Sequence, residues 1–314
     1  MAATTGTTAD KGKGSMAGLH ELSQAQIAQF QRDGFLLVPR FFALEEIGPL
    51  ARAFDEDPTA GGNAFTYDDG SASNHWYLGW VDPRDDLIGT FTTIERVVNG
   101  ASALLGQPVY HFHSKIVIKP AHNRSVIKWH HDYSGWYADG CIAPDMLTCL
   151  VAVSPATRDN GCLKVLRGSQ RVGRMDKESG SPTSTDPSAR ALQDQAYYSL
   201  NPRRLEALFK RFEKVEVEMA PGDALYFHAS TVHSSGENST DKPRIFLEMS
   251  YNATWNEPVL EGQEHHRCRP LLKVRNSAIK DHAYTTVFGR TPCLNVTDPN
   301  GAGTRIFLGN RANR

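Results

Sequence analysis

The chain has 314 residues, of which 40% are hydrophobic and 22% charged, and its 34 basic and 35 acidic residues nearly cancel. These values are typical of a globular protein, and no cluster of Lys and Arg indicates a nucleic-acid or anionic-membrane partner. No apolar run reaches the roughly 18 residues that a membrane-spanning helix needs. The sequence therefore favours a small-molecule partner, and it gives no information on oligomeric state.

The five cysteines are widely spaced and form no C-x-x-C pair. This pattern indicates neither a disulfide framework nor a zinc knuckle. The first residues also lack the basic-then-apolar order of a secretory signal. We therefore expect a cytoplasmic protein in a reducing compartment.

The N-terminal part of the chain predicts a leader followed by helices. Residues 1–18 are small and polar, which favours disorder, and we expect a single domain over 19–314. Ser23 and Gln26 have the spacing of a capping box, and Gly34 is expected to end the first helix before the strand "FLLVP". Further helices are predicted at 43–54, with an interruption at Gly48 and Pro49, and at 87–105.

A stretch rich in Gly, Ser, Asn and Asp lies between these helices. It reads "TYDDGSASNHWYLGW" and forms part of the segment 57–80, which we expect to be an irregular loop. Its aromatic residues are compatible with a lid over a site or with a staple that fixes the loop to the core. Both interpretations stay open.

From Val109 onward, short β-rich runs alternate with turn residues. "KVEVEM" alternates charged and apolar residues, as a strand with one solvated face does, whereas "MLTCLVAV" is apolar throughout and should be central. Asn201 and Pro202 predict the start of an inserted helix over 203–212. The sequence thus predicts a mainly β sandwich or barrel with a supporting N-terminal helical layer.

The segment "KWHHDYSGW" contains a candidate metal site. On a strand, His130 and Asp132 would point to one face and His131 to the other. A histidine and a carboxylate supply two of the three donors of the facial triad that holds non-haem Fe(II). Alone, this three-residue pattern is weak evidence, because it is common and more typical of a surface turn. Farther along the chain, His233 offers a third donor, and Arg244 follows it by eleven residues.

Four segments resemble the phytanoyl-CoA dioxygenase-type family of Fe(II)/2-oxoglutarate-dependent oxygenases. They are "WHHD", "DNGCLKVLRGSQRVG", "PGDALYFH" and "HSSGENSTDKPR", and they occur in the order and spacing of that family. The resemblance extends over residues 22–256. It implies a double-stranded β-helix, also called a jelly roll or cupin-like fold.

The resemblance also implies roles for individual residues. His130, Asp132 and His233 would ligate Fe(II), Arg244 would pair with the distal carboxylate of 2-oxoglutarate, and Ser235 would hydrogen-bond the same carboxylate. Lys115 and Thr148 are further candidate contacts of this cosubstrate. Candidates for the substrate pocket are His113, Trp136, Trp76 and Tyr77. Outside this set, we expect His228 to pack structurally and 265–266 to be exposed.

The activity implied is hydroxylation with consumption of O₂ and 2-oxoglutarate and release of succinate and CO₂. Asp132 argues against a halogenase, because halogenases of the family lack a carboxylate there. "WHHDYSGWYADGCIAPDM" is locally similar to ectoine hydroxylases, although His113 and Lys115 stand where that group has Gln and Arg. We expect a small polar metabolite as substrate. The alternatives are an acyl-CoA or natural-product intermediate, a non-redox cupin-type isomerase, or a metal-free binding module.

Overall fold

The computed structural model describes residues 21–56, 65–66, 76–80, 87–175, 200–263, 266–281, 294–297 and 303–306. The expected leader at 1–18 lies outside them, and the single-domain boundary stays a prediction. Within these residues, no helix has both the length and the apolar character needed to cross a bilayer.

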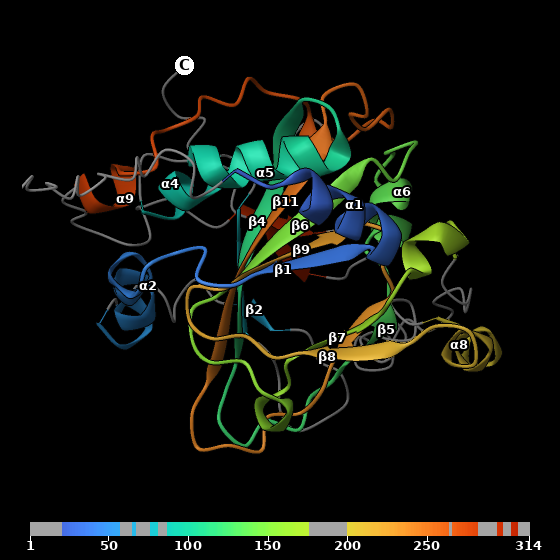
Figure 1. Cartoon of the computed structure of the whole chain (residues 1–314), viewed down its shortest axis with the longest axis horizontal. Helices are drawn as coiled ribbons and strands as arrows, with labels where there is room; N and C mark the ends of the chain where they lie inside the picture. The colour runs from blue at the N-terminus through green and yellow to red at the C-terminus, as the bar shows by residue number, and fades with distance from the viewer. Residues whose placement is uncertain are drawn as a thin grey trace, which may run out of the picture.

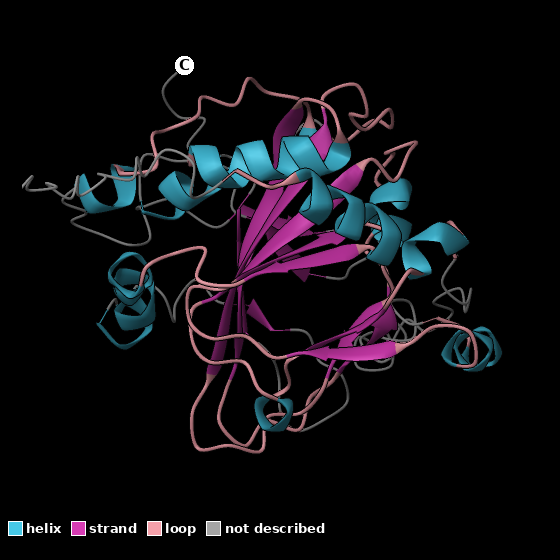
Figure 2. Cartoon of the chain, viewed as in Figure 1, coloured by secondary structure: helices cyan, strands magenta, loops and turns pink. Residues whose placement is uncertain are grey.

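Two antiparallel sheets face each other and enclose the interior of the protein (Figures 1 and 2). The larger sheet has the order β1-β9-β6-β11-β4-β3-β2, and the smaller has the order β5-β10-β7-β8. The larger sheet comprises β1 (Phe35–Val38), β2 (Phe65–Thr66), β3 (Trp76–Trp80), β4 (Val109–Lys119), β6 (Met146–Ala152), β9 (Ala224–His228) and β11 (Arg244–Ala253). The smaller comprises β5 (Ile127–His130), β7 (Leu163–Leu166), β8 (Lys214–Val217) and β10 (His233–Ser235). A separate hairpin joins β12 (Leu294–Thr297) and β13 (Gly303–Ile306).

Helices cover the outer face of the larger sheet, where α1 and α5 run across the strands in Figure 1. The α-helices of the described residues are α1 (Gln24–Asp33), α2 (Leu44–Glu56), α4 (Leu87–Thr93), α5 (Glu95–Leu105), α6 (Tyr133–Ala138), α8 (Pro202–Phe209) and α9 (Ala278–Asp281). Of these, α8 lies beside the smaller sheet, where Phe209 contacts Trp129 of β5 (Figure 1). One apolar cluster fills the layer between helices and sheet, and a second fills the space between the two sheets. The predicted mainly β architecture with a helical layer is therefore confirmed.

The prediction of one helix over 87–105 was wrong, because the helix is divided at Ile94. Ile94 has an extended backbone and forms an isolated parallel bridge with Val274. The Glu95 amide donates to the Val274 carbonyl at 2.9 Å, and the Val274 amide donates to the Thr93 carbonyl at 3.0 Å. A contact between segments far apart in the sequence thus interrupts the helix at a single residue, which a local pattern does not reveal.

The predicted interruption at Gly48 and Pro49 is also absent, because α2 continues through Pro49. Proline removes one helical hydrogen bond. The neighbouring Ile47 and Leu50 are fully buried against the core. Their packing stabilises the helix more than the lost bond weakens it.

The expectation of an irregular loop over 57–80 is wrong at β2, which pairs with β3, and at the C-terminal end of the segment, where β3 lies. β3 pairs with β4 along its whole length, from Trp76 opposite Ile118 to Trp80 opposite Ser114. Pairing with a long neighbouring strand overrides an unfavourable local composition. Residues 57–64 and 67–75 lie outside the described residues, so the lid and the staple stay alternatives for them.

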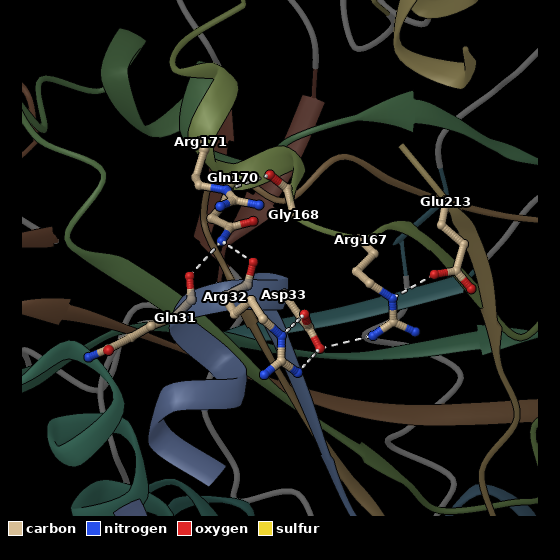
Figure 3. Close-up of polar contacts among 8 residues, drawn as sticks. All are labelled: Gln31, Arg32, Asp33, Arg167, Gly168, Gln170, Arg171 and Glu213. Atoms are coloured by element: carbon tan, nitrogen blue, oxygen red, sulfur yellow. Dashed lines mark hydrogen bonds and ion pairs between the residues drawn. The ribbon is translucent and has the colours of Figure 1, made fainter. Parts of the chain in front are cut away.

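The C-terminal end of α1 is joined to the smaller sheet by a buried carboxylate (Figure 3). Asp33 is 2% exposed and accepts hydrogen bonds from Arg32 at 2.8 and 3.0 Å and from Arg167 at 2.9 Å. Arg167 directly follows β7 and also binds Glu213 at 2.8 Å. This network ties the helical layer to the sheet that carries His233.

Candidate metal centre

Two histidines face each other across the smaller sheet. His130 ends β5 and His233 begins β10, and the antiparallel register places them directly opposite one another. Their ring centroids are 4.2 Å apart. The Asp132 carboxylate oxygen Oδ1 lies 3.6 Å from His130 Nε2 and 3.8 Å from His233 Nε2. All three donor atoms lie within 4.8 Å of one another.

Asp132 reaches this site by a different route from the one expected. β5 stops at His130, and Asp132 has helical backbone angles immediately before α6. The prediction that His130 and Asp132 share one strand face was therefore wrong, although the two side chains meet. His131 lies outside the cluster: it is buried, and its Nε2 accepts the Met175 amide hydrogen at 3.0 Å.

Backbone carbonyls fix the orientation of both imidazoles. His130 Nδ1 lies 2.7 Å from the Lys128 carbonyl, and His233 Nδ1 lies 2.9 Å from the Thr231 carbonyl. A carbonyl only accepts, so each Nδ1 carries the proton and each Nε2 keeps a free lone pair. Both Nε2 lone pairs are therefore available to a cation, as in metal-binding histidines.

The charges around the cluster favour the protonation states that bind a metal. Burial lowers the pKa of His233 to about 4, and the His130 ring contributes to the same shift. Burial alone would raise the pKa of the Asp132 carboxyl, but His233, His130 and Lys115 hold it well below its usual range. Near neutral pH, His233 is therefore neutral and Asp132 is ionised.

The donor set fits a non-haem Fe(II) centre. Two imidazole nitrogens and one carboxylate oxygen form the 2-His-1-carboxylate set, which leaves the remaining coordination positions open. Metal bonds of about 2 Å allow two donors of one ion to lie up to about 4 Å apart. The two carboxylate–imidazole separations, 3.6 and 3.8 Å, satisfy this limit, and all three donor atoms lie within 4.8 Å of one another.

A buried guanidinium with unused donors lies in the interior beyond the histidines. Arg244 is 1% exposed, and its Nη1 donates to the Gly161 carbonyl at 2.6 Å and to Ser235 Oγ at 3.0 Å. Its Nε and Nη2 have no hydrogen-bond partner within the described structure. Burial lowers the pKa of Arg244 to about 10, so it remains charged near neutral pH. A buried cation with two free donors fits an anionic ligand such as a carboxylate.

A second buried cation, which was not among the residues predicted from the sequence, lies at this position. Lys119 is fully buried and is the register partner of Arg244 on the neighbouring strand. Its Nζ donates to Ser235 Oγ at 3.0 Å and to the Gly236 carbonyl. Lys119 lies four residues after Lys115 on one strand, and this alternation was the signal that could have revealed it. Ser235 thus lies between two cations.

The two other candidate cosubstrate contacts lie away from Arg244. Lys115 forms an ion pair of 3.0 Å with Glu248, its register partner on β11. Thr148 hydrogen-bonds Ser250 at 2.9 Å, six residues along β11 from Arg244. At about 3.4 Å per residue, this separation is about 20 Å. The structure therefore brings Ser235, but neither of these two, into contact with Arg244.

Of the substrate-pocket candidates, the structure brings His113 and Trp136 together. Trp136 is buried, and its ring lies 5.7 Å from that of His113 in an edge-on arrangement. Tyr77 is buried between the sheets, with its ring 5.9 Å from Lys115 Nζ. The side chain of Trp76 lies outside the described structure.

The expected exposure of 265–266 was wrong for His266. Its ring is 5% exposed and stacks on Phe112 with centroids 4.1 Å apart. It also lies 5.8 Å from the ring of His113, so the segment after β11 helps to enclose this region. His228 packs structurally as expected, because its Nδ1 accepts the Ser230 amide hydrogen at 3.0 Å and its ring lies 6.4 Å from Phe30.

Comparison with known proteins decides the family. The family model described as phytanoyl-CoA dioxygenase (PhyH) matches residues 30–246, which is more than half of the chain. The chain belongs to the phytanoyl-CoA dioxygenase family. This phytanoyl-CoA dioxygenase family member is 27% identical over 233 residues to the L-proline trans-4-hydroxylase of Streptomyces griseoviridis, with 73% of this chain and 86% of the relative covered. It is also 27% identical over 246 residues to the ectoine dioxygenase of Bordetella bronchiseptica, with coverages of 75% and 77%.

Solved structures show the same fold. EctD from S. alaskensis with 2-oxoglutarate and 5-hydroxyectoine superposes with a TM-score of 0.65 at 23% identity, covering 81% of this chain and 88% of that one. The same protein with bound Fe gives a TM-score of 0.65 at 24% identity, with the same coverages. The jelly-roll prediction is therefore confirmed. The family and its relatives place this chain among the Fe(II)- and 2-oxoglutarate-dependent dioxygenases.

Proposed function

We propose that this family member is a hydroxylase of a small polar metabolite. In this proposal His130, Asp132 and His233 hold Fe(II), and Arg244 holds the distal carboxylate of 2-oxoglutarate. The names of the two relatives support the substrate class, since proline and ectoine are both small polar molecules.

The observation that carries the cosubstrate assignment is the unsatisfied hydrogen-bonding capacity of Arg244. Its Nε and Nη2 are buried without partners in the described structure, and burying a charge without compensation costs several kcal/mol, on the order of the desolvation penalty. A carboxylate at this position would accept from both donors. A cupin-type isomerase would need the metal donors but would have no use for this guanidinium.

Each group has a distinct task in this mechanism. Bound Fe(II) supplies the activation of O₂ that hydroxylation requires. The Nδ1 hydrogen bonds of His130 and His233 hold the two imidazoles in place before the metal arrives. Lys119 adds positive charge beside Arg244. The Ser235 hydroxyl donates to the Gly161 carbonyl at 2.9 Å and would rotate to donate to the same carboxylate. Apolar side chains between the sheets exclude water, which strengthens these charge interactions.

A screen for substrate-dependent succinate release tests the substrate class. The iron-loaded protein is incubated with 2-oxoglutarate, O₂ and either small polar metabolites or acyl-CoA thioesters. We expect succinate formation to rise above the basal rate with a member of the first group. A response confined to the thioesters would contradict the proposal.

A further inference from the structure

A charged pair lies on the inner wall of the larger sheet. Lys115 Nζ is 3.0 Å from Glu248 Oε2, and their side chains are only 33% and 16% exposed. The two residues are register partners on β4 and β11. They thus form one rung of the wall that faces the smaller sheet.

This rung lies apart from the one that carries Arg244. Alternate residues of a strand share a face, so every second register pair of β4 and β11 points toward the smaller sheet and forms one inner rung. The rung next to the pair is apolar and consists of Val117 and Phe246, both packed between the sheets. The rung of Arg244 comes after it, four residues or about 13 Å away along the strand.

The pair instead lies beside the metal donors. Burial alone would lower the pKa of Lys115, but the charges of Glu248 and Asp132 raise it above its usual value. His113, two residues from Lys115 on the same face of β4, has its ring 5.7 Å from the ring of Trp136, which lies on the helix that directly follows Asp132. On the other side, the register partner of Lys115 on β3 is Gly79, which contributes no side chain to the wall.

The stability of the sheet does not require an ion pair at this rung. Removing two charges from water is costly, and apolar residues of similar volume stabilise a buried position equally well or better. The adjacent rung of Val117 and Phe246 is apolar, as this comparison of stabilities predicts. Opposite charges close to a reactive centre are, however, complementary to a ligand that carries both charges.

We propose that Lys115 and Glu248 together recognise a substrate that carries both a carboxylate and a cationic nitrogen. Lys115 binds the carboxylate, and Glu248 binds the cationic nitrogen. This assignment rests on the proposed hydroxylase function, and it moves Lys115 from cosubstrate binding to substrate recognition. Coenzyme A thioesters, whose charged groups at neutral pH are mainly phosphates, offer no cation to Glu248.

The test uses a panel of free amino and imino acids, each with its N-acetyl derivative and its carboxamide. Succinate release by the iron-loaded enzyme with 2-oxoglutarate is measured for every compound. We expect a free zwitterion to stimulate release, and both derivatives to lose about 10- to 100-fold in kcat/KM, the range for one charged hydrogen bond. Glu248→Gln should abolish the discrimination against the N-acetyl form, and Lys115→Gln the discrimination against the carboxamide.

The matched controls are Glu216→Gln and Lys164→Gln. Lys164 on β7 and Glu216 on β8 form a cross-strand ion pair of similar length and exposure. Lys164 Nζ lies 3.4 Å from Glu216 Oε1, and the two side chains are 28% and 23% exposed, respectively. Their variants should leave the discrimination unchanged. Lack of stimulation by any zwitterion, equal stimulation by the derivatives, or unaltered selectivity in both test variants would overturn the inference. Failure of the wild-type protein to bind Fe(II) with 2-oxoglutarate would instead refute the proposed function.

Discussion

At the scale of single residues, the site depends on side chains whose polar atoms are oriented before any ligand binds. The register between β5 and β10 sets His130 against His233, and backbone carbonyls fix both rings. Asp132 enters from the position immediately before the following helix. The three donors therefore need little rearrangement to share one ion.

Replacing His130 by Ala should abolish iron binding, because it removes one of only three protein donors in the cluster. His131→Gln is the matched control, since a Gln side-chain oxygen can accept the Met175 amide hydrogen that His131 Nε2 accepts now. Iron content per protein after anaerobic loading and desalting measures both variants. Equal loss of iron in the two variants would contradict the assignment of His130 as the ligand.

Replacing Arg244 by Lys should raise the KM for 2-oxoglutarate by about 10- to 100-fold, because Lys keeps a charge but lacks the planar pair of donors. Steady-state succinate release at varied 2-oxoglutarate measures this effect. Arg158→Lys is a suitable control, because Arg158 forms a surface ion pair with Glu216. If KM is unchanged in Arg244→Lys, Arg244 does not hold the cosubstrate.

At the scale of elements, the end of α1 is sterically constrained. Gly34 has a φ of +80°, and an added Cβ would lie 2.4 Å from Gln170 Oε1 and 2.7 Å from Thr231 Oγ1. Gly106 ends α5 with a φ of +69° and has open space around it. These two glycines share a left-handed backbone conformation but differ in crowding.

Gly34→Ala should therefore destabilise the fold more than Gly106→Ala. The control should lose about 1 kcal/mol of unfolding free energy from left-handed strain alone. Gly34→Ala should lose that amount plus a penalty of about 1 to 3 kcal/mol for overpacking. Urea unfolding midpoints measure both variants, and equal midpoints would show that the side chains around Gly34 give way freely.

The Asp33 network predicts a pH dependence. Burial alone would raise the pKa of Asp33, but Arg32 and Arg167 hold it below its ordinary 3.8. A carboxyl with a lowered pKa stabilises the fold above its unfolded pKa and loses this effect as pH falls through the folded value. Asp33→Asn should thus cost about 1 to 3 kcal/mol at pH 7 and progressively less below about pH 4.

Unfolding free energies of wild type and Asp33→Asn across this pH range test the prediction. Glu213→Gln is the control, because Glu213 binds the same Arg167 but its side chain is 65% exposed. The control should have a smaller effect at pH 7. A cost for Asp33→Asn that stays constant from pH 7 to pH 3 would contradict the role of its charge.

Local patterns predicted some elements and missed others for physical reasons. The capping box of Ser23 and Gln26 depends on neighbouring residues only, and α1 begins and ends as expected. The break at Ile94 and the strand β3 depend on partners far along the chain, Val274 and β4. A sequence window contains no information on those partners.

At the scale of the whole molecule, two sheets bring together residues that are more than one hundred positions apart. The motifs predicted that His130, Asp132 and His233 would meet, but the strand argument gave the wrong geometry for Asp132. The alternation with Lys115 places Lys119 on the same strand face, but its position beside Arg244 follows only from the register between the two strands. Substrate selectivity likewise depends on cross-strand neighbours such as Lys115 and Glu248, which the sequence does not pair.

The central claim is that the interior between the two sheets binds Fe(II) and 2-oxoglutarate together. Anaerobic titration of the metal-free protein with Fe(II) and then 2-oxoglutarate, followed by visible absorption, tests it most directly. We expect a charge-transfer band that needs both components, is absent in His130→Ala, and requires more 2-oxoglutarate in Arg244→Lys. A wild-type protein that binds Fe(II) but shows no band with saturating 2-oxoglutarate would contradict the account.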